Sequence, residues 1–208
     1  MENPNNKCIL YADDVSALTS CKTVNEVLRS RKPLIESMTE WCTNNNLVLS
    51  TEKTQVSIFS HRNSLLYDDF DLGMVKNVKF LGIYVDSCLK WDSHIDFLCK
   101  KLNTVFYLMS VIKYTVSLNV LKMLYYGLFY SRISYGVMLW GSSPKLHNVF
   151  LIQKKLLRVM FKQHHRAHCR PLFKNQHLLT VPCIYIYHSV IYAKQHLSDF
   201  TQNNSIHS

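Results

Sequence analysis

From Trp91-Asp92-Ser93 onward the apolar residues of this chain keep a helical spacing, and this lasting change determines the class of fold that the chain can form. Before it, short apolar runs between polar turns predict strands and hairpins, with one stretch of helical spacing among them. After it, they recur every three or four residues, which predicts helices. The first of these helices has one apolar face, made of Ile95, Leu98, Leu102, Val105, Phe106, Met109 and Ile112. Further helices are expected at about 117–131, 144–162 and 182–197, so the sequence predicts an α+β fold with an all-helical C-terminal part.

Several short strands are expected in the N-terminal part. Residues 8–18 predict one hairpin. Residues 78–86 predict two short strands around Gly82, joined as a hairpin or at a sharp bend. Two further strands are expected at 47–50 and 55–60. The stretch 61–75 is polar and irregular.

One long helix should lie between the first hairpin and these strands. Thr23 is its candidate N-cap, and Glu26, three residues later, completes a capping box. Apolar residues then recur at helical spacing to about Asn44. Pro33 interrupts the pattern, so the helix either kinks there or restarts with Pro33 in its first turn. The asparagines at 44–46 are a plausible C-terminal stop.

Charge divides the chain at almost the same place as the apolar spacing. Residues 1–96 hold ten lysines and arginines and thirteen acidic residues, a net charge of −3, whereas residues 97–198 hold fourteen basic residues and no acidic one. Such asymmetry indicates two functional zones, which we place at 1–96 and 97–208, with the second facing a polyanion. Its basic residues are interleaved with aromatic ones over a long stretch, unlike a single lipid-binding helix. Nucleic acid is therefore the expected partner.

Size and composition predict a folded intracellular protein. The 208 residues, of which 48% are hydrophobic, are enough to bury a core. No run approaches the roughly 18 continuous apolar residues that span a bilayer, and no signal peptide is visible. The seven cysteines are scattered and odd in number, without a C-x-x-C, which indicates free thiols in a reducing compartment. We therefore expect a cytoplasmic or nuclear protein with no membrane and no disulfide partner.

Tyr11-Ala12-Asp13-Asp14 is the stretch with the clearest chemical potential. Two adjacent carboxylates between short apolar runs suit a tight β-hairpin, with both strands buried and the acids exposed at the turn. There they could hold divalent cations, since Mg²⁺ takes a few protein carboxylates and fills its other positions with water and phosphate. The alternative is an ordinary acidic turn, because Asp is a common turn residue.

The box and the segments after it resemble the reverse transcriptases of non-LTR (LINE-type, jockey-like) retrotransposons. Tyr11-Ala12-Asp13-Asp14 resembles palm motif C, and the helix at 24–44 with the segment after it, 46–54, resembles the approach to motif D. Residues 78–86 resemble motif E, the primer-grip hairpin. Later segments that resemble the same family are 89–95, at the entry to the thumb, 126–136, 140–141 and 153–158. The match covers nearly the whole chain in the right order.

The resemblance implies a partial polymerase palm followed by an all-helical thumb, with a two-metal site in the palm. Asp13 would be the metal-binding aspartate of motif C and Asp14 its neighbour, with Mg²⁺ or Mn²⁺ as the cofactor. In the intact family the metals clamp the attacking and leaving oxygens during nucleotidyl transfer. The implied partners are an RNA template and a DNA primer.

Two further parts of the palm are implied by position. Lys53 would match the motif D lysine, a candidate general acid for the pyrophosphate leaving group; the alternative is a solvated turn lysine. Phe80, Leu81 and Gly82 would lie at the primer grip, where glycine lets the backbone pass close to nucleic acid. Phe80 and Leu81 also suit core positions of a strand, and both interpretations can hold together.

The helical part would be the thumb, and its basic residues are candidates for phosphate contacts. The candidates are Lys100, Lys101, Lys113, Lys154, Lys155, Arg158 and Lys162. Each by itself also fits an ordinary solvated helix face, so the prediction is a collective one, based on the absence of acids in this zone.

Two other clusters in the helical part favour structural interpretations. Tyr125, Tyr126, Tyr130 and Tyr135 recur at near-helical spacing and suit a core better than base-stacking platforms. His164, His165, His168 and Cys169 invite a metal-site interpretation, but no second ligand pair accompanies them, and a basic solvated loop is favoured.

In the family, motif A, which supplies another essential metal carboxylate, and the fingers precede the motif C box, and neither fits into Met1–Cys8. We therefore expect a C-terminal fragment of an RNA-directed DNA polymerase that is inactive by itself. Two alternatives stay open: a non-catalytic nucleic-acid-binding module, and a decayed transposon remnant with no function.

Overall fold

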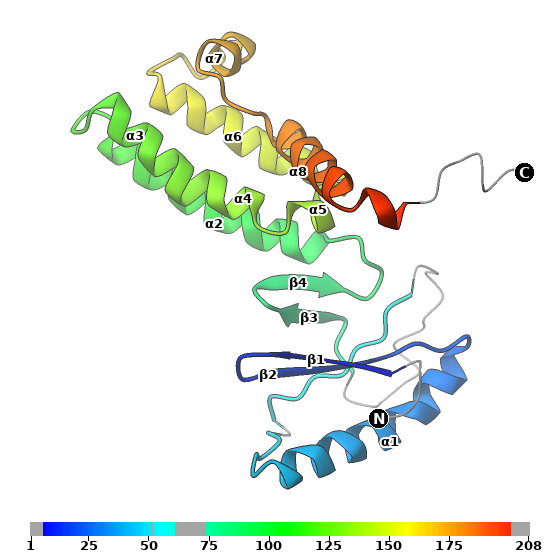
Figure 1. Ribbon diagram of the computed structural model, residues 1–208. Helices are drawn as coiled ribbons and strands as arrows, with labels where there is room; N and C mark the ends of the chain where they lie inside the picture. The colour runs from blue at the N-terminus through cyan, green and yellow to red at the C-terminus, as the bar shows by residue number, and fades with distance from the viewer. Residues whose placement is uncertain (1–5, 51, 61–73, 201–208) are drawn as a thin grey trace, which may run out of the picture. The chain divides into compact units, whose positions relative to one another are not determined.

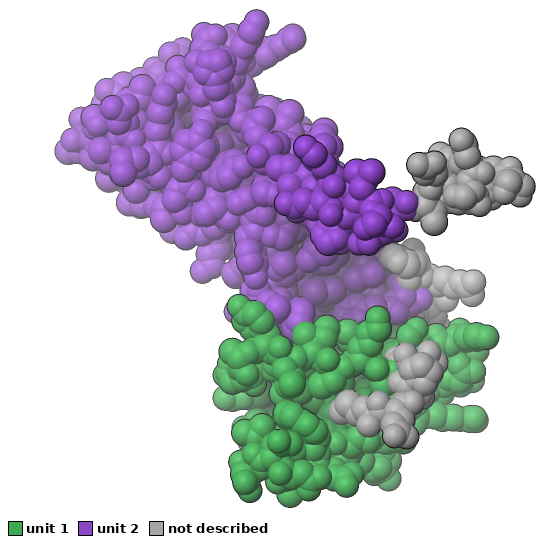
Figure 2. Space-filling model, in the orientation of Figure 1, with its two compact units in different colours: residues 1–58, 66–76 green, residues 59–65, 77–208 purple. Residues whose placement is uncertain are grey.

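The computed structural model describes residues 6–50, 52–60 and 74–200 (Figure 1). The chain is of mixed α+β structure, as the sequence predicts. It forms two compact units, drawn in two colours in Figure 2. The N-terminal unit comprises residues 1–58 and 66–76, and the helical unit comprises residues 59–65 and 77–208. Of the predicted irregular stretch at 61–75, residues 61–73 lie outside the described residues.

An antiparallel hairpin opens the N-terminal unit. Strand β1 (Asn6–Tyr11) pairs with β2 (Asp14–Thr19) in a register that sets Tyr11 opposite Asp14. The hairpin therefore agrees with the one predicted at 8–18. The expectation that both strands are buried is wrong, because the side chains of Ile9 and Leu10 are 43% and 58% exposed. In the described residues this sheet has only two strands, and α1 packs mainly on β2, so the apolar residues of β1 have little to pack against.

Helix α1 (Val24–Asn44) begins and ends as the sequence predicts. The Thr23 side chain accepts a hydrogen bond from the Glu26 N–H, and the Glu26 carboxylate accepts one from the Thr23 N–H, which completes the capping box. At the other end, Asn46 takes a left-handed φ of +57°, and the Leu47 N–H donates to the Cys42 carbonyl at 2.8 Å. This is a Schellman-type ending, which satisfies carbonyls that the last turn leaves free.

Proline does not divide this helix, and the strands predicted after it do not form. Pro33 lies inside one continuous helix of 21 residues. Residues 47–50 and 55–60 were expected as strands, but the structure has only an isolated bridge between Val56 and Met74 there. The side chain of Val48 is 95% exposed. A strand needs a continuous ladder of hydrogen bonds to a neighbour, and beyond this one bridge the described residues of the two segments form no such ladder, so the prediction is wrong.

The helical unit begins with a second hairpin. Strand β3 (Asn77–Phe80) pairs with β4 (Ile83–Asp86) in antiparallel register, with Phe80 opposite Ile83. Leu81 and Gly82 form the turn, with φ of +46° and +82°. Positive φ at both central residues is the geometry of a two-residue hairpin turn whose twist matches the strands. The predicted pair of short strands around Gly82 is confirmed.

The rest of the helical unit is helical, as expected. In chain order it contains α2 (Asp92–Ile112), α3 (Leu118–Leu124), the π-helix η2 (Tyr125–Tyr130), α4 (Ser131–Ser134), α5 (Val137–Trp140), α6 (Leu146–Met160), α7 (Arg170–Asn175), α8 (Val181–Gln195) and the 3₁₀ turn η3 (Leu197–Asp199). The predicted helices at 144–162 and 182–197 correspond to α6 and α8. The one predicted at 117–131 is a run of α3, η2 and α4, and the short α5 and α7 were not predicted.

The core of the helical unit lies where α2 packs along α6 and where α8 packs on α5 and α6. Its largest fully buried side chains include Trp140, Tyr125 and Phe129. The apolar face predicted for the first helix is largely correct, since Ile95, Leu98, Leu102, Val105 and Met109 are buried in α2. None of the helices in the described residues has the length and apolar character needed to cross a membrane.

The unit boundary and the predicted zone boundary fall at different residues. The hairpin β3–β4 packs on α2 and therefore belongs to the helical unit, so the compact units divide near residue 76 and not after Asp96. The zones at 1–96 and 97–208 were drawn from charge and family motifs, and they stay a prediction about function.

Candidate functional site

The two candidate metal ligands lie at the tip of the first hairpin. Because Tyr11 pairs with Asp14, the turn consists of Ala12 and Asp13, and Ala12 takes a left-handed φ of +53°. Both carboxylates are exposed. Neither forms an ion pair or a hydrogen bond with another described residue, so both have oxygen lone pairs available to a cation. The predicted exposure of the acids at a turn is confirmed.

Two carboxylates do not by themselves make a metal cage. Across the described ranges, no group of three or more His, Cys, Asp or Glu side chains is arranged to hold a metal ion. Asp13 and Asp14 would supply two of the oxygen ligands of a Mg²⁺ or Mn²⁺ site, and the other positions would need water, phosphate or a further carboxylate.

Lys53, the candidate general acid, is exposed in a turn that follows α1. The Thr54 N–H and the Thr54 hydroxyl both donate to the Ser50 carbonyl, at 3.0 and 2.6 Å, and close this turn. The lysine side chain is therefore on a defined turn, which is compatible with both interpretations of the sequence. Thr51, in the same predicted loop, lies outside the described residues.

Of the three primer-grip candidates, Leu81 and Gly82 form the tip of the second hairpin and Phe80 ends β3. The Tyr135 hydroxyl donates a hydrogen bond to the Leu81 carbonyl. A Cβ atom added to Gly82 would lie 3.8 Å from the ring of Tyr135, an ordinary contact, so the positive φ is what favours glycine here. Phe80 and Leu81 are half-buried, which agrees with their serving as strand and turn packing residues.

The second hairpin is fastened to the helices by several polar contacts. The Asp86 carboxylate accepts hydrogen bonds from the backbone N–H groups of Lys90 and Trp91, which leads the chain from β4 into α2. The Tyr84 N–H donates to Nδ1 of the buried His94 at 3.4 Å. Burial lowers the pKa of His94, so the neutral ring that can accept this hydrogen bond is favoured. The hairpin tip is thus held on a rigid support.

Two of the predicted phosphate ligands, Lys100 and Lys155, line one groove between α2 and α6. The groove has a volume of about 480 Å³, and the amides of Asn103 and Asn148 also line it. Lys100 and Lys155 are both exposed. Two cations from different helices, with amides between them, can meet neighbouring phosphates of one strand.

The charged residues at one end of this groove leave it with a net positive charge. Asp96 lies at the groove, but Lys145 pairs with it at 3.3 Å and with Asp92 at 3.7 Å. Desolvation lowers the pKa of Lys145, but the hydrogen bond to Asp96 and the charges of both carboxylates together outweigh it, so the pKa is raised. Asp92 and Asp96 carry two negative charges and Lys145, Lys100 and Lys155 carry three positive ones, so the groove and its edge have a net charge of +1.

The other predicted basic ligands are not gathered in this groove. Lys101 Nζ lies 5.5 Å from the centre of the Phe97 ring, and Lys154 Nζ lies 4.5 Å from that of Phe150. Arg158 is half-buried, and its Nε donates to the Ala167 carbonyl at 2.9 Å, so it holds the loop that follows α6. The structure therefore gives Arg158 a clear structural role.

Two further candidates, Lys113 and Lys162, flank one exposed tyrosine. Their Nζ atoms lie 4.9 and 5.4 Å from the centre of the Tyr114 ring. These cation–π contacts gather two positive charges at the end of α2.

The histidine-rich loop after α6 has local hydrogen bonds and no metal-like arrangement. Nδ1 of His164 accepts from the Arg166 N–H, and Nδ1 of His168 accepts from the Arg170 N–H, both at 3.3 Å. Cys169 is buried and directs its thiol to the Lys154 and Ala167 carbonyls. This agrees with the favoured interpretation of a basic solvated loop.

Sequence reasoning missed Gln153, the buried polar centre of the helical unit. Its Nε2 donates to the Tyr125 hydroxyl and to the Leu179 carbonyl, both at 2.9 Å, and its Oε1 accepts from the Val181 N–H at 3.0 Å. The signal was present, since a glutamine stands four residues after Val149 on the apolar face of α6. A polar residue at such a position is buried only when its hydrogen bonds are satisfied.

Comparison of the chain with models of protein families, with curated proteins and with solved structures finds no match.

Proposed function

We propose that this chain is a C-terminal piece of the reverse transcriptase of a non-LTR retrotransposon, comprising part of the palm and the thumb. In the intact family the reaction is extension of a DNA 3′ end on an RNA template by two-metal nucleotidyl transfer. By itself, the piece binds nucleic acid and does not polymerise.

The observation that carries this proposal is the hairpin turn of the Tyr11-Ala12-Asp13-Asp14 box. A two-residue turn presents both carboxylates to solvent at one point, free of protein partners among the described residues. An aromatic-small-Asp-Asp box inside a hairpin is the arrangement that motif C requires. A second two-residue hairpin, at the segment that resembles motif E, adds independent support.

The charge pattern supports the nucleic-acid part of the proposal. No acidic residue occurs from Phe97 to Ser198, and Lys100 and Lys155 line a common groove. Phosphate contacts of this kind give affinity that depends on salt and little on sequence.

A primer-extension assay tests the catalytic part directly. The purified chain is incubated with an oligo(dT) primer on a poly(rA) template, deoxythymidine triphosphate and Mg²⁺, with Asp13→Asn as the matched variant. We expect no extension by either protein, because no third metal ligand joins Asp13 and Asp14 among the described residues. Robust synthesis that Asp13→Asn abolishes would contradict the expected inactivity, and would at the same time support the family assignment.

The second candidate function is a nucleic-acid-binding module with no relation to polymerase chemistry, and the groove lined by Lys100 and Lys155 favours it. Replacing both lysines with glutamate should reduce the slope of log affinity against log salt by about 2, since each phosphate contact in a duplex contributes about 0.9. Lys22→Glu with Lys194→Glu, at exposed lysines before α1 and in α8, is the control of equal charge change. Equal effects of the two pairs would show that only net charge matters and not the groove.

A further inference from the structure

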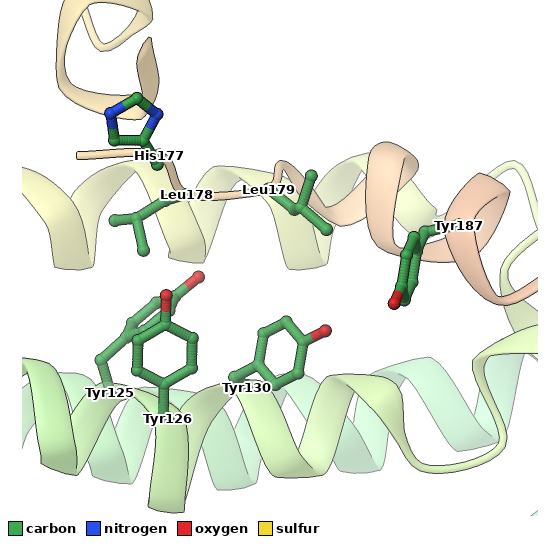
Figure 3. A pocket seen from close by; sticks show the side chains of 7 residues that line it. All are labelled: Tyr125, Tyr126, Tyr130, His177, Leu178, Leu179 and Tyr187. Atoms are coloured by element: carbon green, nitrogen blue, oxygen red, sulfur yellow. The ribbon is translucent and has the colours of Figure 1, made fainter. Parts of the chain in front are cut away.

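A small pocket in the helical unit is lined by four tyrosines and has no part in the function proposed above. Tyr125, Tyr126 and Tyr130 of η2 form one side, and Tyr187 of α8 closes one end (Figure 3). The segment that links α7 to α8, residues 177–179, forms the opposite side (Figure 3). The pocket has a volume of about 300 Å³, at the lower end of the range for small-molecule sites.

The tyrosine side of the pocket is an unusual stretch of backbone. Residues 125–130 form a π-helix between α3 and α4, and π-helical turns are rare and frequently occur at functional sites. The rings of Tyr125 and Tyr126 meet edge to face at 5.3 Å, and those of Tyr126 and Tyr130 are tilted at 5.6 Å. Tyr125 also stacks on Phe129 at 5.6 Å, so these rings form one aromatic cluster, against which a further planar ring can pack.

One hydroxyl in the pocket lacks an acceptor. The Tyr125 oxygen accepts a hydrogen bond from Gln153, but its own hydrogen is donated to no group in the described part of the chain. Tyr125 is 1% exposed, so a donor left without an acceptor there is costly. Burial raises the pKa of Tyr125 to about 12, and the hydroxyl therefore keeps its hydrogen at neutral pH. A ligand with an acceptor atom would complete this hydrogen bond.

The lining excludes a charged ligand. No Asp, Glu, Lys or Arg among the described residues lines the pocket, and apart from His177 its other walls are the leucines at 178 and 179. Basic residues stand on the neighbouring elements, with Lys122 in α3 and Lys174 in α7. A neutral, planar ring with acceptor atoms fits the uncharged lining, and an anionic backbone attached to that ring fits the basic residues on the neighbouring elements.

We propose that this pocket binds one unpaired nucleobase of single-stranded nucleic acid, stacked against the row of tyrosine rings from Tyr126 through Tyr130 to Tyr187 and accepting a hydrogen bond from Tyr125. The inference rests on the proposed nucleic-acid binding by the helical unit and adds a base-binding position to it. Stacking on an aromatic side chain tolerates every base, because each base has a π-face.

The test uses the full chain with Tyr126→Leu and Tyr187→Leu, singly and together. These side chains are 48% and 49% exposed, so leucine is tolerated by the fold, which far-UV circular dichroism checks. The matched control is Tyr107→Leu on α2, a tyrosine that is 69% exposed and is not among the residues that line the pocket. Two probes are used: adenosine, followed by the NMR signals of ¹³C-labelled tyrosine rings, and a fluorescent oligo(dT), followed by anisotropy over a salt series.

We expect adenosine to shift the ring signals of Tyr126 and Tyr187 and to leave those of Tyr107 unchanged. The double variant should bind oligo(dT) about tenfold more weakly, with an unchanged salt slope, since stacking and not phosphate contact is lost. Unshifted ring signals, or variants that bind like the wild type, would overturn the inference while salt-dependent binding still supports the proposed function. Absent oligo(dT) binding by the wild type would overturn the proposed function, whereas the adenosine shifts would still support a nucleobase pocket.

Discussion

Replacing Gln153 with leucine should destabilise the helical unit strongly, because three groups, two of them in buried residues, lose their hydrogen-bond partner at once. The side chain is fully buried and joins α6 to the Tyr125 hydroxyl and to the Leu179 and Val181 backbone groups. Leucine has a similar volume, so the change creates little cavity. The loss is therefore mainly one of hydrogen bonding.

The size of the effect follows from the burial of each partner. Leaving a buried donor or acceptor unpaired costs about 1–3 kcal/mol. Val181 and Tyr125 are 0% and 1% exposed, so their groups should bear most of this cost, whereas Leu179 is 40% exposed and water can replace its partner. We expect a loss of about 2–5 kcal/mol, a large part of the roughly 5–15 kcal/mol that stabilises a typical domain.

Urea unfolding followed by far-UV circular dichroism measures this loss, since the helical unit supplies most of the helix signal. With a loss near 3 kcal/mol and a urea dependence of about 2 kcal/mol per molar, the midpoint should fall by about 1.5 M. Gln195→Leu, an exposed glutamine at the end of α8, is the control and should change stability by less than about 0.5 kcal/mol.

A double-mutant cycle isolates one of the three contacts. Tyr125→Phe alone should cost about 1 kcal/mol, but it should cost almost nothing in the Gln153→Leu background, where the hydroxyl has already lost its partner. If Gln153→Leu lowers the free energy of unfolding by less than about 1 kcal/mol, or if the two substitutions act strictly additively, Gln153 does not stabilise the helical unit through these hydrogen bonds.

Three further predictions concern the helical unit. Because burial raises the pKa of Tyr125 to about 12, the folded state keeps a proton that the unfolded state loses above about pH 10. The free energy of unfolding should therefore fall between about pH 10 and 12, by up to about 3 kcal/mol. Alkaline unfolding of Tyr125→Phe should lack this fall. Because burial lowers the pKa of His94, the unfolded state binds the proton more readily, and stability should fall as pH drops below 6.5; thermal unfolding from pH 7 to 5 should show a shallower decline for His94→Gln. Gly136→Ala should lower the free energy of unfolding in urea by about 2 kcal/mol, because Gly136 has a φ of +61° and an added Cβ would lie 2.5 Å from Cδ1 of Ile83. A variant as stable as the wild type would contradict the packing of Ile83 against this turn.

Local signals predicted the parts of the fold that depend on neighbours in sequence. The capping box of Thr23 and Glu26 and the asparagines after α1 marked both ends of a helix, since caps are formed within a few residues. The turns at Asp13 and at Gly82 were predictable for the same reason, because turn geometry selects particular residue types.

Burial and strand pairing could not be predicted in this way. The apolar run of β1 suggested a buried strand, yet Ile9 and Leu10 are exposed because their surroundings depend on what packs against the sheet. The run at 47–50 has the composition of a strand but no neighbour to pair with in the described residues. Whether an apolar run forms a strand is decided by its partner and not by the run itself.

In the candidate sites, too, the sequence shows the residue types, whereas their proximity depends on how the helices pack. The sequence indicated which lysines belong to the basic zone, but only the packing of α2 on α6 brings Lys100 and Lys155 to one groove, and only the loop after α6 engages Arg158. The π-helix at 125–130 has no recognisable sequence signal, because its apolar spacing is close to that of an α-helix. The tyrosine pocket therefore emerges from the structure alone.

Binding of a labelled RNA–DNA primer–template over a salt series tests whether the chain binds nucleic acid through phosphate contacts. If the chain is a reverse-transcriptase piece in which nucleic-acid binding persists, log affinity should fall steeply between 50 and 200 mM salt, with a slope of at least about 2 in magnitude from two phosphate contacts. Asp13→Asn should leave the slope unchanged, because the carboxylate is not a phosphate ligand. Binding that is undetectable at 50 mM salt, or that does not change with salt, would contradict the account.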